Sequence, residues 1–175
     1  VTRRDGTGWN TFEVQSTYTP QAGDFGDGRH ALVLGLHRNQ YKLQNVVNNA
    51  PDWRGAETTQ NQNYYGKTTI TAGYAQDAWK MTPELTLTSG LRFENFESFD
   101  GSQYFAGPPV AQKAFGSRTL TATSPKLSLA WAASDEFTLR TSLGRGVRFP
   151  NVDELFNGTQ TGTSITTSDP NLRPE

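Results

Sequence analysis

The chain has 175 residues, and its composition excludes several classes of protein before any motif is considered. It has no cysteine, which excludes disulfides, cysteine metal sites and thiol nucleophiles, and its formal net charge of −1 offers no basic field to nucleic acid. Apolar residues never run near the roughly 18 positions that a membrane-spanning helix requires. The aromatic content of 11% argues against disorder. These features favour a folded chain built from strands.

Alternation of apolar and polar residues predicts about six strands in chain order. The first places Phe12, Val14 and Tyr18 on one face, and the second does the same with Leu32, Leu34 and Leu36. Successive side chains of a strand point to opposite faces, so each such segment has one apolar and one polar side. The predicted strands span residues 9–19, 29–43, 67–80, 85–98, 124–133 and 137–146.

The fourth predicted strand has the clearest pattern. Leu85, Leu87, Leu91 and Phe93 share one parity, and the other carries threonines together with an arginine and a glutamate. About ten alternating residues suit a strand that faces lipid on one side and a wet lumen on the other.

The predicted connections differ in length, and the long ones fall at one end of the strands. Short turns follow the first, third and fifth strands, whereas residues 45–66, about 99–120 and the stretch beyond 147 are long and polar. Aromatic residues gather at both ends: Tyr18, Trp79, Trp131 and Phe137 near the short turns, and Trp9, Tyr41, Phe93 and Phe96 near the long connections. Sorted loops and two aromatic belts are typical of a transmembrane barrel. We therefore predict an all-β fold, an antiparallel up-and-down transmembrane β-barrel, of which about six strands can form only a part.

Three segments resemble the barrel of TonB-dependent outer-membrane receptors. They are residues 74–94, which read YAQDAWKMTPELTLTSGLRFE, residues 124–156, and the closing DPNLRPE. They follow one another in the order found in that family, and the resemblance covers roughly residues 29–175. It implies one section of a barrel of about 22 strands, without the plug domain that fills the lumen in such receptors.

The resemblance also implies a function. Such receptors lie in the outer membrane of Gram-negative bacteria, capture a scarce ligand, most often a ferric siderophore, and import it with energy from the TonB complex. The expected partners are outer-membrane lipid and lipopolysaccharide, the ligand, and the plug domain and TonB complex through the parent chain. Two alternatives stay open. A passive porin-like channel would lack plug and TonB box, and a soluble β-rich carbohydrate-binding module would bury its leucines in a dry core.

Candidate ligand contacts lie in the long connections, where aromatic rings and guanidinium groups suit anionic, catechol or sugar ligands. They are Trp53, Arg54, Tyr64, Tyr65, Tyr104 and Phe105. Charged residues within the strands are expected to line the lumen, and these are Asp77, Arg92, Glu94 and Arg140. The motif residues of the resemblance are Arg148, Pro150, Glu154, Leu155, Pro170, Asn171, Leu172, Pro174 and Glu175.

No catalytic or cofactor motif emerges from the sequence. His30 and His37 fall on opposite faces of one strand and cannot share a metal ion. Some haem receptors of the family carry a histidine between the two motif elements, and this chain has none there. We therefore expect no enzyme activity, no metal and no cofactor.

Overall fold

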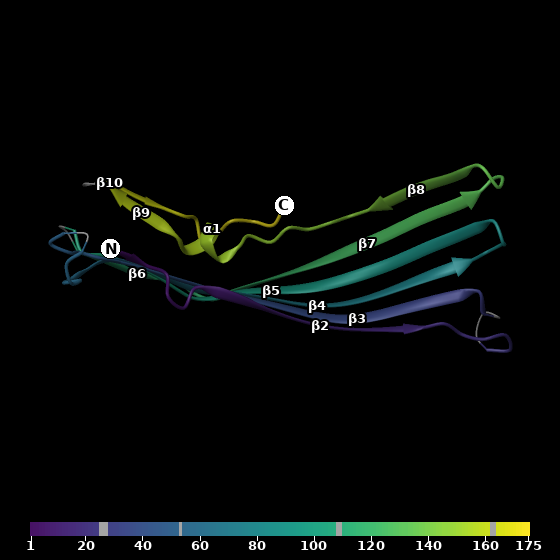
Figure 1. Ribbon diagram of the computed structural model, residues 1–175, viewed down its shortest axis with the longest axis horizontal. Helices are drawn as coiled ribbons and strands as arrows, with labels where there is room; N and C mark the ends of the chain where they lie inside the picture. The colour runs from purple at the N-terminus through teal and green to yellow at the C-terminus, as the bar shows by residue number, and fades with distance from the viewer. Residues whose placement is uncertain (25–27, 53, 108–109, 162–163) are drawn as a thin grey trace.

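The computed structural model describes residues 1–24, 28–52, 54–107, 110–161 and 164–175. Most of them form one antiparallel sheet in which each long strand pairs with the next along the chain (Figure 1). The long strands are β2 (Gly8–Tyr18), β3 (His30–Asn48), β4 (Gln60–Lys80), β5 (Leu85–Phe105), β7 (Arg118–Ala132) and β8 (Thr138–Gly144). The sheet of the described residues is not closed. The predicted all-β, up-and-down fold, as part of a barrel, is confirmed.

Two short strands prolong the sheet at one end. β1 (Thr2–Arg3) pairs with β3 beyond the point where β2 begins, and β6 (Ala111–Ala114) pairs with the far end of β5. Between β1 and β2 the chain turns at Gly6, whose φ of +88° favours glycine. β1 therefore continues along β3 the pairing that β2 makes, and β6 continues along β5 the pairing that β7 makes.

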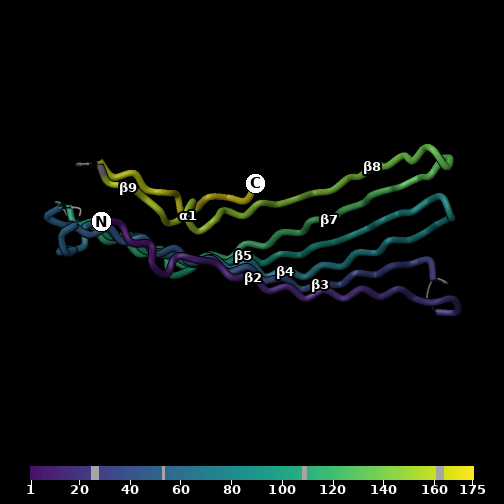
Figure 2. The backbone as a smooth tube through the Cα atoms, viewed as in Figure 1, coloured from purple at the N-terminus to yellow at the C-terminus, as the bar shows by residue number. Residues whose placement is uncertain are grey.

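The strands extend well into the segments that the sequence analysis treated as long loops. β4 begins at Gln60 and not near residue 67, β5 runs on to Phe105, and β3 reaches Asn48. Figure 2 shows these extensions on the side away from the short turns. The extensions are rich in asparagine, glutamine and glycine, and the apolar side chains Tyr64 and Phe105 on their lobe face are flanked by amides, so the hydropathy of the sequence shows no clear period there. Backbone hydrogen bonds need no such period, and the ladder continues.

The two faces of the sheet differ in character. One face, which we call the leucine face, carries exposed apolar side chains at positions that alternate along five strands: Phe12, Val14, Leu34, Leu36, Leu91, Phe93, Leu127, Leu129, Leu139 and Leu143. Leu143 is 78% exposed. The opposite face, which we call the lobe face, carries Tyr74, which is paired with Arg92 of β5, and Lys126 on the next strand, β7.

A small lobe folds back over the lobe face at the end with the strand extensions (Figure 1). It contains α1 (Val152–Phe156), β9 (Gly158–Thr161) and β10 (Ser164–Thr167), the last two forming a separate hairpin. The sequence analysis expected an irregular polar segment here. The compact core of the chain lies beneath this lobe: Leu43, Tyr64, Phe96, Phe105, Phe149, Val152, Leu155 and Phe156. Among the described residues, no helix is long and apolar enough to cross a membrane.

Phe156 is seated where two neighbouring strands lack side chains. Gly66 in β4 and Gly101 in β5 both lie against its ring, and a Cβ atom at either glycine would overlap ring carbons. The ladder between β4 and β5 shifts register between Tyr65 and Lys67, which marks a β-bulge at this place. The bulge and the two glycines together create the recess that anchors the lobe.

The aromatic belt expected near the long connections is only partly present. Phe93 lies on the leucine face, but Phe96 is buried beneath the lobe and stacks on Phe149 with ring centroids 5.1 Å apart. Trp9 and Tyr41 form a cross-strand pair on the lobe face. Tyr18, Trp79 and Trp131 do lie on the leucine face, close to the short turns. Three of the four rings expected in the belt near the long connections therefore lie on the lobe face, because parity, and not height alone, decides which surface a ring meets.

The glycine recess predicts a specific effect of one added methyl group. Gly66→Ala should displace the Phe156 ring and destabilise the packing of the lobe by about 1–3 kcal/mol. Amide hydrogen exchange of residues 152–167 in the intact protein should then accelerate, while exchange in β7 and β8 stays unchanged. Gly73→Ala is the matched control in the same strand, because its nearest neighbour would be a Leu36 carbon 3.6 Å away, an ordinary contact. Equal exchange in both variants would contradict this account of the recess.

Candidate functional site

The lobe face carries a polar network that joins four strands. At its centre the ring of Tyr74 in β4 lies over Gly35 in β3, where any Cβ atom would overlap it. The Tyr74 hydroxyl donates to Glu13 Oε1 at 2.8 Å and also lies 2.9 Å from Gln15 Oε1, so it reaches across β3 to β2. Gly35 therefore allows one tyrosine to span two neighbouring strands.

Arg92 in β5 extends the network on the other side of Tyr74. Its Nε donates to Glu94 Oε1 at 2.9 Å, a terminal nitrogen lies 2.8 Å from His37 Nδ1, and its guanidinium carbon lies 5.8 Å from the centre of the Tyr74 ring. Since Arg92 is a donor only, His37 Nδ1 accepts and its Nε2 carries the proton. That nitrogen lies 3.0 Å from Asn39 Oδ1. The network thus holds the His37 ring between an arginine and an amide.

Three of the four expected lumen-lining residues share this face. Arg92, Glu94 and Arg140 lie at positions of one parity across β5, β7 and β8. The prediction that Asp77 shares this face was wrong, because Asp77 pairs with Ser89 and therefore lies on the leucine face. There its Oδ2 is 2.8 Å from His30 Nδ1, and the His30 ring stacks on Trp79.

The error at Asp77 has a simple cause. In β4 the more apolar parity, which contains Ile70, Tyr74 and Ala78, lies on the polar lobe face. Pairing with β5 fixes this arrangement, and hydropathy within β4 does not.

Cationic side chains collect on the lobe face toward β7 and β8. A hollow of about 330 Å³ is lined by Glu13, Tyr74, Arg92, Ser124, Lys126 and Arg145, among others. Arg140 lies with Lys126 beside a second hollow further along the same strands. Within the described part of the chain, neither Lys126 nor Arg140 has an ion-pair partner. This region can therefore attract an anion.

The candidate ligand contacts from the long connections do not converge on one surface. Tyr64 and Phe105 are buried under the lobe, where their rings meet edge to face. Burial raises the pKa of Tyr64 to about 12, and its hydroxyl donates to Gln62 Oε1 at 2.7 Å. Tyr65 and Tyr104 lie on the opposite side of the sheet.

The remaining two candidates belong to the connection between β3 and β4. Arg54 is exposed there, and its backbone amide donates to Asp52 Oδ1 at 2.7 Å. Trp53 lies outside the described residues.

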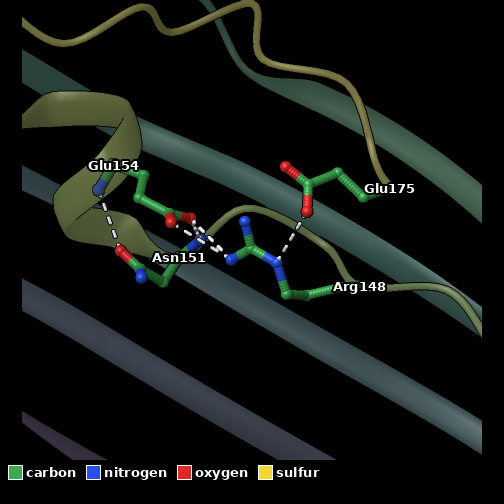
Figure 3. Close-up of polar contacts among 4 residues, drawn as sticks. All are labelled: Arg148, Asn151, Glu154 and Glu175. Atoms are coloured by element: carbon green, nitrogen blue, oxygen red, sulfur yellow. Dashed lines mark hydrogen bonds and ion pairs between the residues drawn. The ribbon is translucent and has the colours of Figure 1, made fainter.

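The motif residues form a compact clamp at the base of the lobe (Figure 3). Arg148 binds both carboxylate oxygens of Glu154 at 3.1 Å, and its Nε lies 3.3 Å from Glu175 Oε2. The backbones of Arg148 and Glu175 also exchange two hydrogen bonds of 2.9 and 3.0 Å. The two distant motif elements are therefore tied to each other directly.

The first turn of α1 contributes to the same clamp. Asn151 Oδ1 accepts from the Glu154 amide, and Glu154 accepts in return from the Asn151 amide, which is a capping box. The hydrogen bond from the Asn151 backbone, together with Arg148, lowers the pKa of Glu154 below its ordinary value.

The other motif residues support the clamp. Leu155 is fully buried, Pro150 is also buried, and Arg118 in β7 donates to the Leu172 carbonyl at 2.7 Å. Asn171 donates its amide to Asp169 Oδ1 at 2.8 Å. Pro170, Pro174 and Glu175 lie in the closing segment that returns to Arg148.

Sequence reasoning missed the tyrosine network and the helix. The Asn151-x-x-Glu154 spacing was a signal for the helix start, as a capping box. The contacts of Tyr74 and His37 had no such signal, because they depend on register between strands. No group of three or more potential metal ligands occurs within the described ranges.

Comparison with protein families gives one match that covers nearly the whole chain. The model of the TonB-dependent receptor-like β-barrel matches residues 2–175. No curated protein matches the chain.

The clamp predicts a dependence of the lobe on pH. Because the pKa of Glu154 is lowered in the folded state, its stabilising contribution is complete above the ordinary value of 4.5 and is lost as the pH falls through the lowered value. Hydrogen exchange of α1 in the intact protein should therefore accelerate in acid. Glu154→Gln should remove most of this change, and Glu136→Gln in the β7–β8 turn should keep it. An identical pH profile in wild type and Glu154→Gln would contradict the assignment.

Proposed function

Because the chain belongs to the TonB-dependent receptor-like β-barrel family, we propose that it forms part of the wall of a receptor that captures a ferric siderophore-type anion and imports it with energy from TonB. Members of this family are outer-membrane transport receptors of Gram-negative bacteria. The observation that carries the proposal is the contrast between the two faces of the sheet: exposed leucines on one, and an arginine, lysine and tyrosine surface on the other.

The leucine face supports placement in a membrane. Its apolar side chains fill a band from Leu85 to Phe93 on β5, about nine residues, which matches the length of a tilted barrel strand across the hydrocarbon core. Next to the band, a hollow of about 400 Å³ lined by Leu85, Leu129, Trp131 and Leu139 suits an acyl chain. Beyond the band, the side chains of β3 and β7 that lie on the leucine face are polar. In this placement the lobe and the strand extensions lie on the extracellular side.

The lobe face supports an anionic ligand in the lumen. Lys126 and Arg140 come from adjacent strands and form no ion pair in the described structure, while Arg92 is already engaged by Glu94 and His37. A wet lumen leaves such charges hydrated and ready to attract an anion at long range. Ferric siderophores that carry catecholate or carboxylate groups have this charge.

Family membership supports energy coupling and the remaining partners as parts of this proposal. In this proposal a plug domain occupies the lumen against the lobe face, and the TonB complex acts through it. A passive channel of the porin type would share the two-faced wall but would need no energy.

The proposal is tested by uptake into cells that express the intact receptor. Ferric siderophore-type anions should be accumulated only in energised cells with an intact TonB system. Lys126→Gln/Arg140→Gln should weaken ligand binding by about tenfold, the effect of losing about 1.4 kcal/mol of attraction. Lys80→Gln/Lys113→Gln is the control for net charge, because these two lysines lie away from the 330 Å³ hollow.

Uptake that persists without TonB would favour the passive channel. Equal binding by both double variants would contradict the anion site. Each result therefore rejects a different part of the proposal.

A further inference from the structure

One row of side chains on the lobe face crosses four strands beside Arg92. Glu13 of β2 lies opposite His37 of β3. His37 lies opposite Ala72 of β4, and Ala72 lies opposite Glu94 of β5. Arg92 contacts both Glu94 and His37, the two residues that flank Ala72. Ala72 is 2% exposed, and its small side chain leaves room for the guanidinium of Arg92 to reach across β4 to β3.

The contact between Arg92 and His37 exists in only one protonation state of the imidazole. A guanidinium has donors and no acceptor, so the 2.8 Å contact requires that Nδ1 of His37 carries no proton. The ring donates through Nε2, because Asn39 Oδ1, at 3.0 Å from Nε2, also accepts from the Thr11 hydroxyl. A proton added to Nδ1 places two donors and two positive charges at the distance of one hydrogen bond. Protonation of His37 therefore breaks its contact with Arg92.

The groups around His37 can rearrange without leaving a charge unpaired. Within the described structure, the titratable and charged groups that face His37 are Glu13 from β2, Tyr74 from β4, and Arg92 and Glu94 from β5. The Tyr74 hydroxyl, which donates to Glu13, also lies 2.9 Å from Gln15 Oε1 and can donate there instead. Glu13 is then able to pair with a protonated His37. Arg92 keeps its bond from Nε to Glu94 while its terminal nitrogen becomes free.

This rearrangement changes the charge of the 330 Å³ hollow on the lobe face. Glu13 and Arg92 both line that hollow, together with Lys126 and Arg145. Protonation of His37 adds one positive charge beside the hollow, neutralises Glu13 and frees a guanidinium donor of Arg92. Each of the three changes favours an anion in the hollow.

We propose that His37 is a protonation switch that makes the anion site of the lobe face bind more tightly in mild acid. While His37 is neutral, it occupies the terminal nitrogen of Arg92. Once His37 is protonated, Glu13 pairs with the imidazolium and Arg92 binds the anion. Linkage requires the reverse as well, so a bound anion favours proton uptake by His37. The switch rests on the anion site of the proposed function, and not on TonB or on the identity of the imported ligand.

The test measures binding of naphthalenetrisulfonate to the isolated intact receptor in a nonionic detergent. This anion keeps its full charge over the range in which histidine changes charge, from about pH 5 to about pH 8. Wild type should bind it about fivefold more tightly at the acid end of that range. His37→Gln has no proton to gain and should bind with one affinity throughout. His30→Gln is the matched control, because it removes the other histidine of this chain, on the leucine face, and should keep the wild-type dependence.

A second variant separates the release of Arg92 from the charge of His37 itself. Arg92→Gln keeps a titratable His37 but has no guanidinium to release, so it should lose most of the gain in acid. Thermal unfolding of each variant at both ends of the range checks that the barrel is folded. The proposal is overturned if either His37→Gln or Arg92→Gln keeps the full pH dependence of wild type.

Failure of the anion site itself gives a different result. Lys126→Gln/Arg140→Gln would then bind naphthalenetrisulfonate as tightly as wild type at every pH, and the switch would be rejected together with the site. If the site is correct and only the switch is wrong, the double variant binds more weakly at every pH while His37→Gln still follows the wild-type profile. Support for both is a double variant that binds more weakly but keeps the gain in acid.

Discussion

The continuous backbone ladder from β2 to β8 is the constraint on which the rest of this structure depends. A strand in contact with lipid must satisfy every backbone donor and acceptor through its neighbours, because the bilayer core supplies no water for them. Unbroken pairing fixes the register of each strand, and the register fixes which side chains share a face. The leucine band, the tyrosine network and the contact between Arg92 and His37 all result from that one alignment. A slip of one residue in a single strand would send its leucines to the lobe face.

Glycine opposite an aromatic ring is the second recurring feature of the chain. Tyr74 covers Gly35, and Phe156 is seated against Gly66 and Gly101. In the first case the missing side chain lets a tyrosine reach Glu13 two strands away, and in the second it lets a lobe dock on the wall. Both contacts join segments distant in sequence, and the second fixes α1 against the lobe face of β4 and β5.

The charged groups of the two faces serve different surroundings in the proposed placement. On the lobe face Arg92 is balanced by Glu94, while Lys126 and Arg140 remain available in the wet interior. On the leucine face Asp77 lies opposite Ser89, at the middle of the band on β5, and it is paired with His30. This distribution follows from the cost of placing an unpaired charge in hydrocarbon.

Alternation of leucines in the sequence was enough to predict an all-β, meandering wall, because the period of two follows directly from strand geometry. It was also enough to place Arg92, Glu94 and Arg140 together, since each lies opposite an obvious apolar face within its own strand. The motif residues Arg148, Glu154 and Glu175 were identified through resemblance, but their direct contact was not.

The tertiary structure decided the rest. The strand extensions lack the alternating leucines of the band, so only pairing reveals them. Asp77 was misplaced because β4 carries its more apolar parity on the lobe face. The sequence by itself determined the fold class and the family, since these depend on local periodicity and short motifs. Which residues meet across strands and beneath the lobe was decided only by the register, because those contacts join positions that no local pattern relates.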